Sequence, residues 1–278
     1  MHIISCRFLR LPGPHKDHSR IDGSLGWKHV RVIKFVENVR CKDEVLNKKV
    51  RVLRIAPPSK KLLGHISDSK HRAWTTSEPT AWDILDLMRR TNETTTILSC
   101  IRLGAAKINN LAVQVLFADK RKRSLATLPL DFETNPENYD EQCKFIVKRA
   151  PSPAMTNVYE GMRIYLTRNL NKDEGFVNGM GARVMHYNHK FKCLEVITEQ
   201  HKRLAVYLYN EDVENCGRVS YFRIRISYAG AVQKAQGATL SHVTFWPDKP
   251  GCRAAAYVAL SRVQHDNDYL VGGRVTRP

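Results

Sequence analysis

Residues 80–116, TAWDILDLMRRTNETTTILSCIRLGAAKINNLAVQVL, are the stretch of sequence that decides the fold class. Thr80 followed three residues later by Asp83 resembles a capping box, in which each residue satisfies a backbone donor of the other at the start of a helix. The β-branched run TTILS at 95–99 predicts a strand, and apolar residues three and four apart over 105–116 predict a second helix. A helix, a strand and a helix of these lengths indicate a parallel sheet with crossover helices.

The segments that flank this unit extend the same pattern. RVIKF at 31–35 predicts a strand after a loop at 12–30, and residues 43–54 have near-helical spacing that Pro57 and Pro58 end. Toward the C-terminus, the expected elements are a helix at 228–236, a strand at 243–246, a helix at 254–260 and a strand at 269–271. We therefore expect the α/β pattern on both sides of the middle of the chain.

The middle of the chain has a different character. Residues 118–158 lose periodicity and contain four prolines, so we interpret them as a connecting arm. Short strand candidates separated by polar turns then follow at 162–166, 182–187, 194–198, 204–208 and 218–226. This spacing predicts a small antiparallel barrel at 159–224, inserted into the α/β fold.

The composition favours a polyanionic partner. The 278 residues include 45 Lys and Arg against 27 Asp and Glu, a formal net charge of +18. Each phosphate that such a surface neutralises releases condensed counterions, which favours nucleic-acid binding. The alternative is a basic solubility surface or a ribonucleoprotein scaffold.

Cysteine spacing and hydropathy argue against several classes of protein. The seven cysteines form no C-x-x-C pair and the 11 histidines no H-E-x-x-H pattern. We therefore expect a reduced intracellular compartment, with no disulfide framework and no metal site. Because no apolar run approaches the roughly 20 residues that span a bilayer, we expect a soluble chain with no membrane partner.

Two segments near the C-terminus carry residue types that hold phosphates. Lys234 lies between two glutamines and precedes Gly237, and amide and ammonium donors there can bind nucleic-acid or nucleotide phosphates. Ser261-Arg262 ends the next expected helix, where an arginine can stabilise charge on a transferring γ-phosphoryl group. Taken singly, the first segment is also compatible with an amphipathic helix capped by glycine, and the second with a surface arginine.

Together, these two segments resemble a helicase family. QKAQGATL at 233–240 and YVALSRV at 257–263 resemble the fifth and sixth motifs of superfamily-one helicases of the PIF (petite integration frequency) type. That family usually has His-Lys-Ser-Gln-Gly in the former place. Gln233 and Ala235 depart from the pattern, whereas the matching residues are Lys234, Gln236, Gly237, Ser261 and Arg262.

Other segments extend the resemblance in the family's order. YEGMRIYLTRN at 159–169 with GFVNG at 175–179 resembles the family's small inserted barrel, and residues 95–109 resemble the segment before it, whose strand end meets the DNA backbone. ENVRC at 37–41 resembles the Asn-Tyr-Arg motif, whose arginine senses the γ-phosphate, with a valine in place of the tyrosine. CRFLRLP at 6–12 resembles the Gly-Asp-Phe-x-Gln-Leu-Pro motif that couples nucleotide state to DNA.

The resemblance implies a RecA-like α/β fold: a parallel sheet with helices on both faces and an inserted small antiparallel β-barrel. Its implied parts are a remnant of a first motor domain with a loop (1–30), the RecA-like domain in two pieces (31–158 and 225–278) and the barrel (159–224). Arg40 and Arg262 would be catalytic arginine fingers. They would also bind the nucleotide together with Gln236 and Gly237. The residues implied to contact single-stranded DNA are Ser99, Cys100, Arg102, Gln233, Lys234 and Thr239.

The sequence contains no G-x-x-x-x-G-K-[ST] phosphate loop. In this family the loop and the Mg²⁺-holding acidic residue lie upstream, in a first motor domain that we expect as a missing partner. We therefore expect the C-terminal part of an ATP-dependent 5′–3′ DNA helicase of DNA repair or recombination. It would use ATP and Mg²⁺ only if another domain supplied the phosphate loop. Its nucleic-acid ligand would be single-stranded DNA, or alternatively RNA. The other hypotheses are a non-catalytic nucleic-acid-binding remnant of a helicase and a basic ribonucleoprotein scaffold. The expected compartment is either the nucleus or the mitochondrion.

Overall fold

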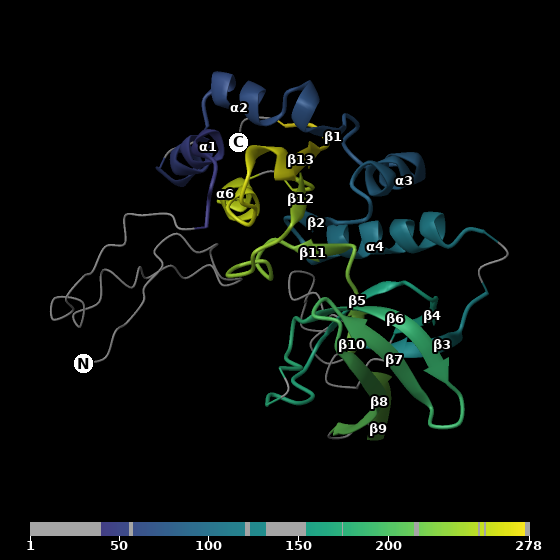
Figure 1. Cartoon of the computed structure of the whole chain (residues 1–278). Helices are drawn as coiled ribbons and strands as arrows, with labels where there is room; N and C mark the ends of the chain where they lie inside the picture. Colours follow the sequence, from purple (N-terminus) through teal and green to yellow (C-terminus); the bar gives the residue numbers. More distant parts are fainter. Residues whose placement is uncertain are drawn as a thin grey trace, which may run out of the picture.

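The computed structural model of the chain consists of two sheets with helices around the first (Figure 1). The described residues are 40–55, 58–119, 123–131, 154–173, 175–213, 217–249, 251, 252 and 254–275. The strand expected at 31–35, the loop at 12–30 and the motif at 6–12 lie outside the described residues.

The first sheet is parallel, as predicted from residues 80–116. Its five strands, in spatial order, are β1 (Arg72–Trp74), β13 (Tyr269–Gly272), β12 (His242–Trp246), β2 (Thr95–Ser99) and β11 (Ala229–Ala231). Strand β2 therefore lies between two strands that follow it only after the second sheet in the sequence. The chain leaves the parallel sheet after β2, builds the second sheet and then returns.

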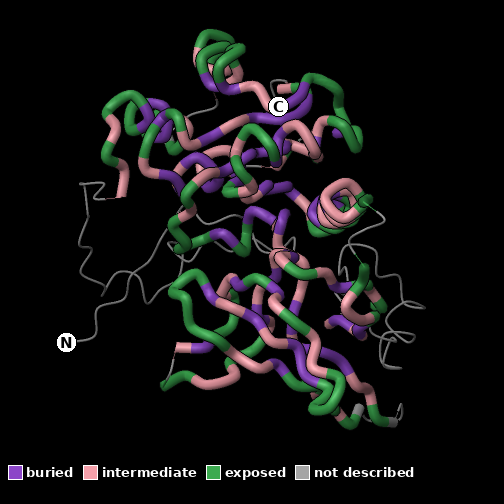
Figure 2. The backbone as a smooth tube through the Cα atoms, turned by 45° about the vertical axis from the view of Figure 1, so that its right-hand side comes forward, coloured by how far each residue is buried: buried purple, intermediate pink, exposed green. Residues whose placement is uncertain are grey.

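Helices cover both faces of the parallel sheet, which confirms the predicted layering. One core lies under α1 (Glu44–Ile55) and α6 (Ala255–Leu260), and the other lies under α3 (Ala81–Arg90) and α4 (Arg102–Leu116). Because side chains alternate along a strand, Leu98 of β2 enters the first core and Ile97 the second. The shorter helices are α2 (Lys60–Ile66), η3 (Ser69–His71) and η5 (Asp266–Asp268). Figure 2 shows buried stretches of backbone running through the interior and exposed stretches mainly at the periphery.

The predicted start of α3 is confirmed. The Oγ1 atom of Thr80 accepts a hydrogen bond from the backbone N–H of Asp83 at 3.2 Å, and the carboxylate of Asp83 accepts one from the backbone N–H of Thr80 at 2.8 Å. Two donors that the first helical turn leaves unpaired are satisfied in this way. A local sequence pattern therefore fixes the helix that covers this face of the sheet.

The second sheet is largely antiparallel and surrounds its own core. Its strands, in spatial order, are β10 (Ile224–Ile226), β5 (Arg163–Leu166), β6 (Gly181–Asn188), β7 (Cys193–Thr198), β8 (Arg203–Val213), β9 (Gly217–Phe222), β3 (Ala126–Leu130) and β4 (Ala154–Val158). Each of the eight strands contributes at least one side chain to a single buried cluster. The strands therefore wrap around one interior, as a small barrel does.

Two sequence-based expectations differ from the structure. The helix expected at 228–236 is wrong: the segment forms β11 and then turns as far as Gly237. Residues 118–158, interpreted as a connecting arm without regular structure, contain β3 and β4, which are hydrogen-bonded to each other over five residue pairs. The barrel limits of 159–224 stay a prediction, although β3 and β4 lie in the same sheet as the strands inside those limits.

Core packing is the default expectation for the large aromatic side chains Trp74, Trp82, Trp246 and Tyr257, and the structure confirms it for three of the four. Trp74 and Trp246 are buried and meet edge to face, with ring centroids 6.3 Å apart, as expected. Tyr257 packs against the core and is partly buried. Trp82 departs from the expectation, because its side chain on the first turn of α3 is 67% exposed. It lies on the solvent side of a helix whose opposite face is apolar.

A buried ionic cluster ties α1 to the far end of the chain. The ammonium of Lys49 lies 2.8 and 3.0 Å from the two carboxylate oxygens of Asp266 and 3.0 Å from the hydroxyl of Tyr269. The ring of His71 stacks on Tyr269 at 4.4 Å, and its Nε2 atom lies 3.0 Å from the carbonyl oxygen of Asp266. The side chains of Lys49 and Asp266 are only 10% and 11% exposed, so each charge depends on the other.

We predict that Lys49→Met lowers the free energy of unfolding by about 3 kcal/mol, because it leaves the Asp266 carboxylate buried without its cation. Urea denaturation measures the change. Lys48→Met is the matched control: Lys48 lies next to it on α1, is 75% exposed and pairs with Glu44 at 2.8 Å. The control should change stability by less than about 0.5 kcal/mol. Equal losses in the two variants would contradict the stabilising role of the buried pair.

Candidate nucleic-acid and nucleotide interface

The carboxyl end of β2 places the first group of predicted DNA contacts. Ser99 is fully buried and its hydroxyl donates to the carbonyl oxygen of Ile101 at 2.7 Å. Cys100 is also buried, and burial raises the pKa of its thiol. Arg102, the first residue of α4, is exposed. Of these three predicted residues, Arg102 therefore presents its side chain to solvent, and the DNA contacts themselves stay predictions.

A carboxylate that was not predicted from the sequence lies at this edge. Asp248 follows β12, and its Oδ1 atom accepts a hydrogen bond from the backbone N–H of Cys100 at 2.6 Å. Burial raises the pKa of this carboxyl group. A side chain added at Gly104 on α4 would collide with the other carboxylate oxygen, so the glycine permits this approach. The signal was available, because the carboxyl ends of neighbouring parallel strands meet at one edge of a sheet.

Lys234 lies against the inserted sheet. It follows β11, and its ammonium donates to the hydroxyl of Tyr165 on β5 at 3.0 Å, close to the tyrosine ring. Desolvation, assisted by the charges of Arg225 and Arg102, lowers the pKa of Lys234 to about 8. Arg225 on β10 lies 3.6 Å from the carboxylate of Asp131. The structure therefore gathers Arg102, Lys234 and Arg225 into one group, here called the cationic cluster.

The cationic cluster combines residues that the sequence predicted with residues that it did not. Arg102 and Lys234 were predicted to contact DNA, whereas Arg225 and the hydroxyl of Tyr165 were not. Arg225 and Tyr165 lie on neighbouring antiparallel strands, directly opposite each other. This pairing follows from the register of β5 and β10, which no local pattern in the sequence reveals.

The remaining predicted residues of this segment lie on an exposed turn. Gln233, Gln236 and Thr239 are exposed, and Gly237 has a φ of +93°, a conformation that favours glycine. The side-chain amide of Gln233 lies 3.4 Å from the carbonyl oxygen of Cys100, which connects the turn to the end of β2. The turn thus exposes backbone and amide groups beside the cationic cluster, and their contacts with DNA or nucleotide stay predictions.

Arg40 and Arg262 lie close together at the other end of this turn. The guanidinium of Arg40 donates to the hydroxyl of Thr239 and to the carbonyl oxygens of Gly237 and Ser261, at 3.0, 3.1 and 3.0 Å. Arg262, the next residue after Ser261, donates to the carbonyl oxygens of Val258 at 2.8 Å and Ala235 at 3.3 Å. We call this group the arginine junction.

The two arginines of the junction differ in exposure. Arg262 is 5% exposed, so its guanidinium is held inside the protein and does not project from a domain edge. Two of the hydrogen bonds from Arg40 lie at exposed positions. In this arrangement Arg262 fixes the turn between β11 and β12. Arg40 is the more accessible of the two arginines to a ligand that approaches from solvent. Their catalytic roles stay predictions.

The described residues define what the site can bind. No group of three or more His, Cys, Asp or Glu side chains within them is arranged to hold a metal ion. Among the helices that the structure describes, none combines the length and the apolar character that crossing a bilayer requires. The cationic cluster and the arginine junction instead offer ammonium and guanidinium groups, which suit phosphate oxygens.

A parallel sheet covered on both faces and interrupted by a small antiparallel sheet is a fold of RecA-like helicases. Solved structures of Pif1 helicases are among those that the fold of this chain matches. Pif1 from Candida albicans matches with a TM-score of 0.66 and 17% identity over 95% of this chain and 62% of that one. Bacteroides Pif1 bound to ssDNA matches with a TM-score of 0.60 and 15% identity over 85% and 50%. Bacteroides Pif1 with ADP-AlF3 and ssDNA matches with a TM-score of 0.59 and 15% identity over 86% and 51%.

These matches establish the fold of the chain. No family model and no curated protein sequence matches it. The chain spans about half the length of the Bacteroides structures and 62% of the Candida albicans structure. Its fold is therefore that of a large part of a Pif1 helicase.

We predict that the ammonium of Lys234 titrates near pH 8, because partial desolvation and the neighbouring charges of Arg225 and Arg102 disfavour its protonated form. Nuclear magnetic resonance of the labelled lysine side chains, assigned with Lys234→Arg, measures the midpoint. Arg225→Gln should raise the midpoint, because it removes one of the positive charges that disfavour protonation. Arg218→Gln is the control, since Arg218 on β9 pairs with Asp212 and is 65% exposed. A midpoint near 10.5 in the unmodified protein would contradict the desolvated site.

Proposed function

We propose that this chain is the C-terminal part of an ATP-dependent DNA helicase and that its cationic cluster binds the phosphates of single-stranded DNA. The observation that carries the proposal is the convergence of Arg102, Lys234 and Arg225 from α4, the turn after β11 and the inserted sheet. Like charges held together disfavour one another, and a polyanionic strand would relieve that repulsion. The Bacteroides Pif1 structures bound to ssDNA, which share the fold, support this ligand class.

The arginine junction would serve the nucleotide in this proposal. Arg40 and Arg262 lie together beside Gly237, where the resemblance places nucleotide contacts. Phosphoryl transfer requires positioning and charge stabilisation together, and the sequence contains no phosphate loop to hold the β- and γ-phosphates. ATP and Mg²⁺ would therefore be engaged only between this chain and a domain that supplies the loop. Only that complete motor would translocate along single-stranded DNA in the 5′–3′ direction.

A second candidate function is a non-catalytic nucleic-acid-binding module with the same fold. The observation that favours it is the burial of Arg262, whose guanidinium is already hydrogen-bonded to protein groups. The basic ribonucleoprotein scaffold is less well supported, since it does not require a parallel sheet interrupted by an antiparallel one. Hydrolysis by the complete motor separates the first two candidates.

We predict steeply salt-dependent binding to an oligo-dT strand. The logarithm of affinity should fall linearly with the logarithm of salt concentration, with a slope of about −0.7 for each phosphate contacted. Fluorescence anisotropy measures the slope, and Arg102→Ala should make it shallower by about 0.7, the share of one contact. Arg218→Ala should leave it unchanged. Affinity that stays constant between low and moderate salt would count against the proposal.

We predict that the purified chain does not hydrolyse ATP, with or without single-stranded DNA, because it holds only the arginine side of the proposed site. A coupled ATPase assay across gel-filtration fractions measures this. DNA-stimulated hydrolysis that follows the protein peak and disappears in Arg40→Gln would refute the prediction. Arg40→Gln is preferred to a change at Arg262, whose buried hydrogen bonds make unfolding a competing explanation.

A further inference from the structure

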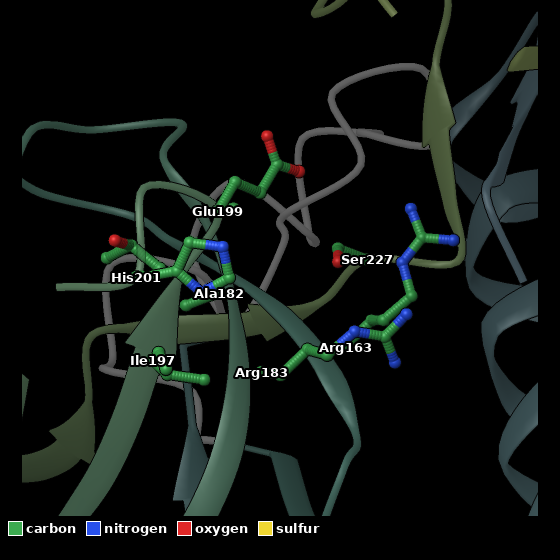
Figure 3. A pocket seen from close by; sticks show the side chains of 9 residues that line it. Arg163, Ala182, Arg183, Ile197, Glu199, His201 and Ser227 are labelled. Atoms are coloured by element: carbon green, nitrogen blue, oxygen red, sulfur yellow. The ribbon is translucent and has the colours of Figure 1, made fainter. Parts of the chain in front are cut away.

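The inserted sheet carries a pocket that belongs to neither the cationic cluster nor the arginine junction. Its volume is about 270 Å³, and it opens between strands β5, β6 and β7 and the chain that returns to the parallel sheet. Figure 3 shows the side chains of Arg163 and Arg183 on one side and those of Glu199 and His201 on the other. Ser227, the residue before Tyr228, also lines the space.

Two arginines stand directly opposite each other across β5 and β6. Arg163 and Arg183 are register partners of these antiparallel strands. Like charges in such a pair are destabilising. The carboxylate of Glu93 lies 3.4 Å from Arg183 and offsets part of the repulsion. Burial, followed by the charge of Arg183, lowers the pKa of Arg163, although Glu199 and Glu93 act in the opposite direction.

The two arginines are held differently. Arg163 is fixed, because its guanidinium donates to the carbonyl oxygens of Glu93 and Thr95 at 2.8 and 2.7 Å and to the hydroxyl of Thr96 at 3.2 Å. Arg183 is 46% exposed and uses Nη1 for Glu93 and for the carbonyl oxygen of Gly161. Within the described residues, its Nε and Nη2 groups donate no hydrogen bond. Arg163 thus supplies a fixed charge, and Arg183 supplies donors.

The opposite wall holds the polar side chains of Glu199 and His201, and the charge of the Glu199 carboxylate favours the protonated form of Arg163. The carboxylate of Glu199 and the imidazole of His201 make no hydrogen bond or ion pair with any described residue. The backbone N–H of His201 donates to the carbonyl oxygen of Thr198 at 3.0 Å, which fixes the turn, and its φ is +60°. Glu199 lies against Gly181, where an added Cβ would come within 3.1 Å of its carboxylate.

We infer that this pocket binds a phosphate group, with Arg183 as the direct donor, Arg163 as a fixed positive charge and the Ser227 hydroxyl and His201 ring as further donors. Glu199 limits the affinity by its negative charge. The phosphate would come either from a nucleic-acid strand or from a free nucleotide, and the two sources share the same chemistry. If the phosphate belongs to a nucleic-acid strand, the inference rests on the proposed function.

The position of the pocket suits a strand that continues from the cationic cluster. Arg163 and Tyr165 are two residues apart on β5, so they share a face and lie about 7 Å apart along the strand. Tyr165 contacts Lys234 in the cationic cluster, whereas Arg163 contacts the amino end of β2. The two sites are therefore adjacent and use different side chains.

The experiment follows the imidazole resonance of His201, assigned with His201→Asn, during titration with inorganic phosphate, ADP or oligo-dT. The expected result is a shift of the resonance that saturates. Arg183→Gln should weaken binding about tenfold, because a charged donor is lost. Glu199→Gln should strengthen it, which a misfolded variant could not do. Arg218→Gln, outside the pocket, should change nothing.

The probes distinguish the sources. A response to phosphate and ADP supports a nucleotide source, and a response to oligo-dT alone supports a strand. Lys234→Ala separates this inference from the proposed function: a lost oligo-dT response with a retained ADP response supports the pocket as an independent site. No response to any of the three probes, or equal affinities for Arg183→Gln and Glu199→Gln, would overturn the inference while leaving DNA binding at the cationic cluster untouched.

Discussion

The attachment of Arg163 to the amino end of β2 is the constraint on which the two sheets depend. Its guanidinium binds two carbonyl oxygens and a hydroxyl group of residues 93–96, and its backbone N–H lies 3.3 Å from the hydroxyl of the buried Tyr228. Strand β5 is thereby held along the parallel sheet, and Tyr165 comes to lie beside Lys234. The ion pair of Arg183 with Glu93 and the stacking of Phe117 on Tyr159 add further contacts between the two parts of the fold.

The same attachment explains why positive charges gather where the sheets meet. Arg102 belongs to the parallel domain, Arg225 to the inserted sheet and Lys234 to the segment that returns between them. Asp131 lies beside Arg225, but the desolvated ammonium of Lys234 still has a lowered pKa. Apolar contacts, such as the stacked rings of Phe117 and Tyr159, add to the polar contacts that hold this positively charged junction together.

Local sequence patterns predict local structure, whereas the residues that long-range strand pairing brings together have no such pattern. Thr80 and Asp83 lie within one helical turn, so their capping box was predictable. The apolar run around Ala229–Ala231 predicts a helix but forms a strand, because a short buried strand and a buried helix segment have no distinct periodicity. Arg102 and Lys234 carried a sequence signal through the family motifs. Arg225, Tyr165 and Asp248 did not, because only strand register and sheet order bring them to the site.

The order of strands in the parallel sheet also governs when that sheet can form. β1 pairs with β13 through Arg72 and Val271, and β2 pairs with strands that begin only at Ala229. Contacts between residues so far apart in sequence close slowly, because a long loop must be ordered first. Neighbouring strands from β5 to β9 instead pair with the next strand in the chain. During synthesis, the inserted sheet therefore has nearly all its strand partners while the surrounding parallel sheet still lacks β11, β12 and β13.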